Sequence, residues 1–107
     1  MDNGVYYLKY TSLARDDMLE ILMYISEEAG APRSAERILY KIGSDLDRLR
    51  HNPYSAPVAR DDYLSSQGFR VLVSEKYLAL YKVNDLEQSV TVYRIVHGKR
   101  NLEWLFP

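Results

Sequence analysis

Residues 68–100 read GFRVLVSEKYLALYKVNDLEQSVTVYRIVHGKR, and this stretch decides the fold. It holds three short runs rich in Val, Leu and Tyr, separated by polar breaks, at residues 68–73, 77–83 and 90–97. Runs of this length and composition predict three consecutive β-strands. The break at 74–76 predicts a tight hairpin, and the break at 84–89 predicts a longer one. The rest of the chain is expected to pack against this sheet or to extend from it.

A further strand and a helix are predicted upstream of this stretch. Residues 5–10 alternate in a way that predicts a strand with one apolar face. The side chains expected on that face are Tyr6, Leu8 and Tyr10. From 13 to 25, apolar residues recur at steps of three and four, which predicts an amphipathic helix. Ser12 is the expected N-cap of this helix, because its hydroxyl can accept a hydrogen bond from the first turn.

A second helix is predicted from Pro32 to the Asn52-Pro53 pair. The link around Gly30 is so short that the two helices must form an antiparallel hairpin. The segment 53–67 is loop-like, with two prolines and no sustained period.

This order of elements predicts the fold class. Strand, helix, helix, strand, strand, strand is typical of an α+β fold with a mainly antiparallel sheet. The helical hairpin is expected to cover one face of the sheet, and the other face to be open or covered by the tail or a partner. The whole chain, residues 1–107, is expected to form a single domain.

Composition excludes several classes of site. The chain has no cysteine, so it can form neither disulfides nor thiolate metal sites. Neither His51 nor His97 has a metal ligand nearby in the sequence, and no glycine-rich phosphate loop is present, so we expect no metal and no cofactor. No apolar run reaches the roughly 18 residues that span a membrane. With no recognisable signal peptide, a cytoplasmic protein is expected.

The charge pattern points to a candidate binding surface late in the chain. The side chains concerned are Arg70, Arg94, His97, Lys99 and Arg100, which we expect to converge at one end of the sheet. Between Arg94 and Glu103, three cations and one carboxylate give a formal charge of +2, whereas the whole chain totals −1. One interpretation is a site for an anionic ligand or acidic partner. The other is that Arg70 and Arg94 pair with carboxylates of the helices.

The chain resembles a known family in the order and spacing of its motifs. These are the strand and helical hairpin, Asn52-Pro53, Gly68-Phe-Arg70, Tyr77-x-x-x-Tyr81 and Arg94-Ile-x-His97-Gly-x-Arg100-Asn101. Together they resemble the RelE/ParE toxins of bacterial type II toxin–antitoxin (plasmid-stabilisation) modules, over residues 5–106. RelE-like members cleave mRNA in the ribosomal A site, whereas ParE-like members inhibit DNA gyrase.

The resemblance implies a toxin nearer to ParE. Arg70 and Arg100 fall on cationic positions of the RelE pattern. Leu72 and Leu78 stand where RelE-like toxins carry further cations, and Phe106 stands near a late tyrosine but has no hydroxyl. The absence of a basic excess also argues against an enzyme that binds the ribosome.

The expected function is therefore non-enzymatic inhibition of DNA gyrase, neutralised by a cognate antitoxin in a heterotetramer or higher complex. The residues expected to bind the target are Arg70, Arg94, His97, Lys99, Arg100 and Trp104, with Phe106 as a further apolar contact. The alternative is a ribosome-dependent endoribonuclease that uses Arg70, His97 and Arg100 on mRNA, because His97 can exchange protons near neutral pH. A third interpretation is a degenerate toxin kept as an interaction module.

Overall fold

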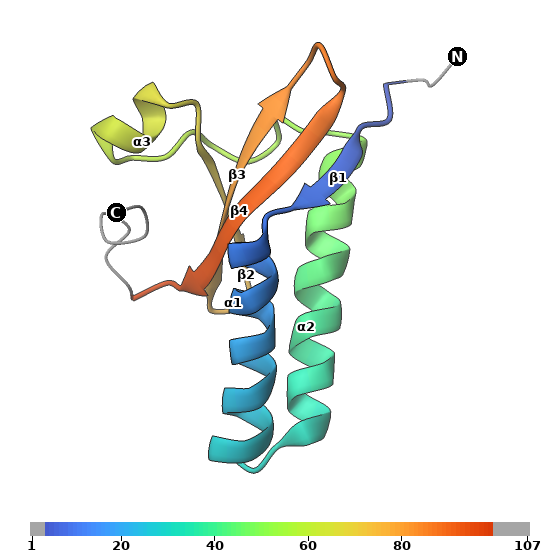
Figure 1. Ribbon diagram of the computed structural model, residues 1–107, viewed down its shortest axis with the longest axis vertical. Coiled ribbons are helices and arrows are strands. Elements are labelled where there is room, and N and C mark those ends of the chain that lie inside the picture. Colours follow the sequence, from blue (N-terminus) through green and yellow to red (C-terminus); the bar gives the residue numbers. More distant parts are fainter. Residues whose placement is uncertain (1–3, 100–107) are drawn as a thin grey trace.

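The computed structural model describes residues 4–99 (Figure 1). Its elements are β1 (Tyr7–Tyr10), α1 (Ser12–Met23), a π-helical turn (Tyr24–Glu28), α2 (Pro32–Asp47), a 3-10 turn (Arg48–Arg50), α3 (Asp62–Ser66), β2 (Arg70–Ser74), β3 (Tyr77–Asn84) and β4 (Ser89–His97). The predicted α+β order is confirmed. The short helix α3 lies within residues 53–67, for which the sequence predicts a loop.

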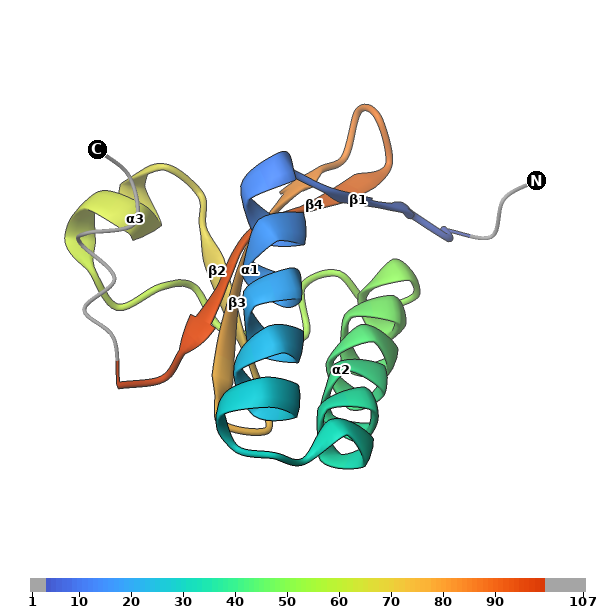
Figure 2. The same ribbon diagram turned by 60° about the horizontal axis from the view of Figure 1, so that its bottom comes forward.

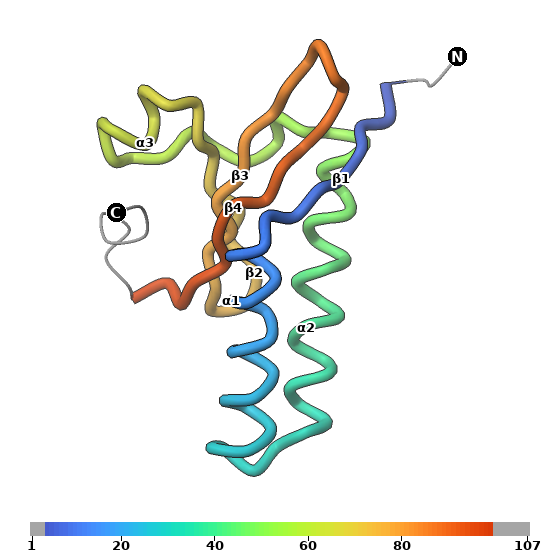
Figure 3. The backbone as a smooth tube through the Cα atoms, in the orientation of Figure 1, coloured from blue at the N-terminus to red at the C-terminus, as the bar shows by residue number. Residues whose placement is uncertain are grey.

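The four strands form one sheet in the order β1-β4-β3-β2. The pairs β2–β3 and β3–β4 are antiparallel, as predicted, whereas β1 pairs with β4 in parallel. Parallel pairing needs a long connection. The helical hairpin carries the chain from one edge of the sheet to the other, and β2 and β3 then lead back to β4 beside β1 (Figure 3). The edges of the sheet are therefore β1 and β2.

Each face of the sheet carries its own apolar cluster. Helices α1 and α2 lie on one side and α3 on the other (Figure 2). The helix-side core includes Ile21, Ile42, Leu46, Tyr81 and Val92, with Tyr6, Leu8 and Tyr10 of the first strand segment packed against it as expected. The α3-side core consists of Ala59, Leu64, Phe69, Leu80 and Val96. The second face, expected to be open or covered by the tail or a partner, is thus partly covered by α3 and the loop before it.

The start of α1 lies one residue earlier than the sequence suggested. The backbone of Thr11 is extended, and its Oγ1 accepts a hydrogen bond from the N–H of Ala14 at 3.1 Å. Thr11 is therefore the N-cap, and Ser12 is the first helical residue, so the prediction for Ser12 is wrong. The Thr11 hydroxyl also donates to the carbonyl of Tyr93 at 2.8 Å, which fixes the start of α1 on β4. Among residues 4–99, no helix combines the length and the apolar character needed to cross a membrane.

Candidate functional site

Arg94 of β4 forms a buried ion pair with α1. Its Nε donates to Oδ2 of Asp17 at 2.8 Å and its Nη2 donates to Oδ1 at 2.9 Å. Asp17 also accepts the backbone N–H of Ile95 at 2.9 Å, and its side chain is only 8% exposed. The hydrogen bond to Asp17 raises the pKa of Arg94 above its usual value. Pairing of Arg94 with a helix carboxylate is therefore confirmed, and this pair fastens α1 to β4.

Arg70 of β2 has a different partner from the one expected. Its Nη1 donates to the carbonyl of Ala56 at 2.6 Å, and its guanidinium lies over the ring of Tyr54, 4.8 Å from the centroid. No helix carboxylate within residues 4–99 forms an ion pair with it, so the pairing expected for Arg70 is wrong. Arg70 instead holds the loop before α3 against β2.

His97 and Lys99 lie together where β4 ends. The Nδ1 of His97 accepts the backbone N–H of Lys99 at 3.2 Å, and the His97 ring packs edge-on against Tyr77, with 5.6 Å between centroids. Both His97 and Lys99 are exposed. Burial raises the pKa of Tyr77, so its hydroxyl stays protonated near neutral pH. Because Nδ1 accepts this hydrogen bond, Nε2 is the nitrogen through which His97 can meet a partner.

The structure does not bring Arg70 and His97 together. Arg70 pairs with Tyr81 and His97 pairs with Tyr77, so they are four residues apart along β3, about 13 Å. Both β2 and β4 are antiparallel to β3, so the start of β2 and the end of β4 lie at opposite ends of the sheet. The expected convergence at one end is wrong, because two successive antiparallel pairs make β2 and β4 run in the same direction.

A cleft of about 700 Å³ adjoins His97. It is bounded by α1, α2, the β2–β3 turn and the end of β4, and its lining includes Ile21, Ile25, Ile38, Ile95, Tyr24, Arg37, Glu75, Lys76, Tyr77 and His97. The sequence prediction missed Tyr24, Arg37, Lys76 and Tyr77. Only their closeness around the β2–β3 turn marks them, and that is a property of the fold. The floor is aliphatic and the rim carries both charge signs, which suits a protein segment better than a small anion.

The last positions singled out by the sequence are Leu72, Leu78, Arg100, Trp104 and Phe106. Leu72 packs against the helix-side core and Leu78 against the α3-side core. Arg100, Trp104 and Phe106 lie outside the described residues. Within residues 4–99, no three His, Asp or Glu side chains gather closely enough to hold a metal ion.

A family model matches this chain from residue 8 to residue 102, and its description is the ParE toxin of the type II toxin–antitoxin system, parDE. The chain belongs to the ParE toxin family. The match covers most of the chain and confirms the resemblance to RelE/ParE toxins, nearer to ParE. It identifies the protein as a toxin of the type II toxin–antitoxin class.

Solved structures share the fold of this ParE-family chain. A chain of the chromosomal ParDE system from P. aeruginosa is 20% identical, covers 90% of this chain and 99% of its own length, and has a TM-score of 0.73. The RelBE2 toxin–antitoxin complex from Mycobacterium tuberculosis is similar at 21% identity, 87% and 98% coverage and a TM-score of 0.59. A mutant of the E. coli toxin RelE in the free state follows at 11% identity, 89% and 85% coverage and a TM-score of 0.60. A comparison with curated proteins found no match.

Proposed function

We propose that this ParE-family toxin inhibits DNA gyrase by binding it and catalyses no reaction itself. The observation that carries the proposal is the separation of Arg70, Arg94 and His97. Arg70 and Arg94 hold elements of the fold together, and Arg70 and His97 lie about 13 Å apart along the sheet. The ParE family match supports the same target class.

The chemical requirements of RNA cleavage also support this proposal. A nuclease must deprotonate the attacking 2′-hydroxyl, stabilise the developing charge and protonate the leaving oxygen. Arginine stays protonated and is a poor general base. His97 is the remaining candidate, and the described cation nearest to it in sequence is the exposed Lys99. The described residues therefore supply a contact surface more readily than an acid–base pair.

The target surface in this proposal is the end of β4. His97 and Lys99 are its described members, and Arg100 and Trp104 continue it in the sequence. Arg70 and Arg94, which the sequence also suggested as target contacts, are assigned to the fold. The chain is proposed to act in the cytoplasm as part of a plasmid-stabilisation type of module, with a cognate antitoxin that neutralises it in a heterotetramer or higher complex.

A DNA supercoiling assay with purified toxin and gyrase tests the proposal. We expect inhibition of supercoiling and accumulation of trapped DNA breaks. The double variant His97→Ala, Lys99→Gln should lose at least tenfold in potency while keeping its circular dichroism spectrum. Lys9→Gln, an exposed change on β1, is the matched control and should keep full potency.

Primer extension on mRNA in a cell-free translation reaction tests the alternative, a ribosome-dependent nuclease. Site-specific cuts that need the ribosome and disappear in His97→Ala would establish the nuclease instead. Normal supercoiling in the presence of excess folded toxin would independently exclude gyrase as the target.

A further inference from the structure

The outer edge of β2 is only half covered. The N–H of Val71 donates to the carbonyl of Pro57 at 3.1 Å, and Ala59 donates to the carbonyl of Phe69 at 2.9 Å. These bonds add a short segment beside the first half of β2, through the single bridge between Val58 and Arg70. Because Pro57 has no N–H, it cannot return a hydrogen bond to Val71. The covering segment therefore stops at this proline.

Beyond Pro57, β2 presents free backbone groups. The two-residue turn places Ser74 opposite Tyr77, so alternate residues from Ser74 bond to β3 and Val73 points its N–H and C=O outward. Within residues 4–99, the structure shows no partner for these groups of Val73. The Val73 side chain is also 66% exposed. An exposed edge with a β-branched side chain is a template for an added strand.

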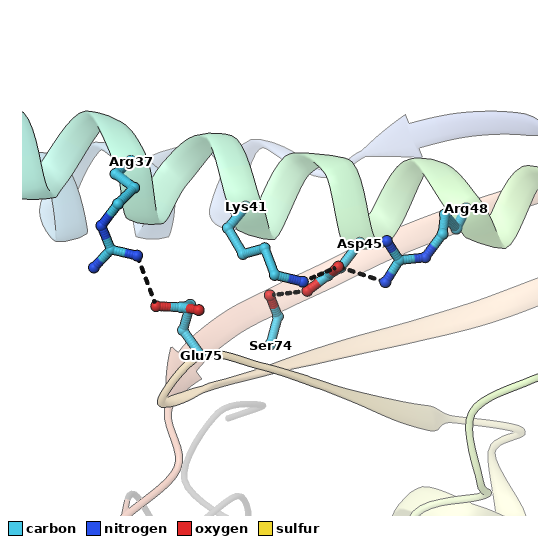
Figure 4. A network of polar contacts seen from close by, with 6 residues as sticks. All are labelled: Arg37, Lys41, Asp45, Arg48, Ser74 and Glu75. Carbon is cyan, nitrogen blue, oxygen red and sulfur yellow. Dashed lines mark hydrogen bonds and ion pairs between the residues drawn. The ribbon is translucent and has the colours of Figure 1, made fainter.

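A row of cations runs along α2 beside the same edge (Figure 4). Asp45 is the centre of this row: its Oδ2 accepts the hydroxyl of Ser74 at 2.6 Å, and its Oδ1 accepts Lys41 at 2.6 Å and Arg48 at 2.5 Å. One turn beyond Lys41, Arg37 reaches Glu75 at 3.5 Å. These contacts join α2 to the end of β2 at two points. They also hold the three cations in a line.

The row keeps an excess of positive charge that faces solvent. Arg37, Lys41 and Arg48 contribute three positive charges, and Asp45 and Glu75 contribute two negative charges, so the net charge is +1 in a chain that totals −1. Lys76, in the turn that follows β2, adds a further positive charge nearby. The side chains of Arg37 and Arg48 are 65% and 70% exposed. From Arg37 to Arg48 the helix rises about 16 Å, which is the length of about five residues of extended chain.

We propose that the outer edge of β2 takes an extended acidic peptide segment as a fifth strand. Its backbone bonds to Val73 and to the outward carbonyl of Val71, for which residues 4–99 provide no partner. Side chains alternate between the faces of a strand, so every second residue faces α2 and carries a carboxylate for Arg37, Lys41 or Arg48. The intervening residues are apolar and cover the exposed side chain of Val73.

Charge decides between this occupant and a second copy of the chain. Pairing two β2 edges about a twofold axis would bring two cationic rows together, and like charges at close range oppose association. An acidic segment instead neutralises the row. The identification of this segment with part of the antitoxin rests on the proposed function, whereas the chemistry of the edge does not.

Model peptides test the edge directly with the whole purified chain. The probe is a fluorescein-labelled heptapeptide of alternating Glu and Val, and the comparison is the same peptide with Lys in place of Glu. Fluorescence anisotropy should show the Glu/Val peptide binding at least tenfold more tightly, with affinity falling as salt rises. Amide exchange at Val73 should slow when this peptide is bound. Equal binding of the two peptides, or unchanged exchange at Val73, would overturn the proposal.

Variants separate the backbone contribution from the charge contribution. Val73→Pro removes an N–H without a described partner, so the fold should survive, and peptide affinity should fall at least tenfold. Arg48→Gln leaves Lys41 and Ser74 on Asp45 and should weaken binding several-fold, whereas Arg15→Gln on α1 is the matched control and should not. If Val73→Pro stays folded and binds as tightly as the parent chain, the strand addition is wrong.

A separate experiment tests whether the acidic segment belongs to the antitoxin. Val73→Pro should inhibit gyrase as well as the parent toxin does, yet need at least tenfold more antitoxin for neutralisation. Equal neutralisation would contradict the assignment to the antitoxin. Failure of the parent toxin to inhibit gyrase would count against the proposed target and would leave the peptide result standing.

Discussion

Arg70 and Arg94 show how the partner of a residue decides its role. Both are strand arginines that the sequence placed in the target-binding set. In the structure, Arg94 is neutralised by the buried Asp17 and Arg70 donates to a loop carbonyl. Removing one partner of a buried ion pair costs more than the pair contributes, because the remaining charge stays desolvated.

The pair between Asp17 and Arg94 gives the first prediction. Asp17→Ala should lower the free energy of unfolding by about 3–5 kcal/mol, because Arg94 is left without its carboxylate and the N–H of Ile95 without its acceptor. Urea denaturation followed by circular dichroism measures the change. Asp16→Ala is the control, since Asp16 is exposed. Equal loss in both variants would show that the ion pair does not stabilise the fold.

Asp45 gives a prediction about pH. Burial alone would raise the pKa of Asp45, but hydrogen bonds from Lys41, Ser74 and Arg48 outweigh it and hold the pKa below its usual value. A carboxyl whose pKa is lower in the folded state stabilises the fold above its unfolded pKa of about 3.9. This stabilisation is lost as the pH falls through the folded value.

Unfolding measured from pH 6 down to pH 2 tests this directly. The free energy of unfolding of the parent chain should fall below about pH 4. Asp45→Asn should be less stable at pH 6 and should show a shallower fall, because the titrating group is gone. Parallel curves for the two chains would mean that Asp45 is not part of the acid transition.

The chemical type of the candidate residues was readable from the sequence, but their grouping was not. His97 and Lys99 are neighbours in sequence and remain neighbours in the structure. Arg70 lies far from them because it begins β2, whereas they lie at the end of β4, which runs in the same direction as β2. Arg37 and Lys76 join the cleft only through the fold, and no local pattern marks them.

At the level of elements, the strands and the helical hairpin were predictable and their ends were less so. Apolar periodicity indicates where α1 and α2 lie, but a cap depends on one backbone conformation. Thr11 and Ser12 are both good N-cap residues, and only the extended backbone of Thr11 decides between them. The five-residue α3 is too short for periodicity to show. Asp61, whose Oδ1 accepts the N–H of Leu64 at 2.9 Å, is the signal that could have marked its start.

The N-cap gives the third prediction. Thr11→Ala should lower the free energy of unfolding by about 1–2 kcal/mol. The N–H of Ala14 loses its acceptor, and the carbonyl of Tyr93 on β4 loses its hydroxyl donor. Ser12→Ala should change it little, since Ser12 is exposed and already helical. Thermal unfolding of the two variants side by side measures the difference. A larger loss in Ser12→Ala would restore the sequence-based assignment of the cap.

At the scale of the whole molecule, two surfaces meet around the β2–β3 turn. The end of β4 offers His97 and Lys99 to a target, and the edge of β2 offers Val73 and a cationic row to an acidic strand. Lys76 lies in the turn between them. A segment bound along β2 would therefore end close to the proposed target surface, which gives neutralisation a simple steric basis.

The central claim is that this toxin acts by occupying its target and not by turnover. The most direct test is the stoichiometry of inhibition, measured by titrating a fixed amount of gyrase with toxin in a supercoiling assay. We predict that inhibition rises in proportion to toxin and saturates near molar equivalence. Full gyrase activity at a molar excess of toxin, with mRNA cut on ribosomes at toxin concentrations far below that of the mRNA, would contradict the claim.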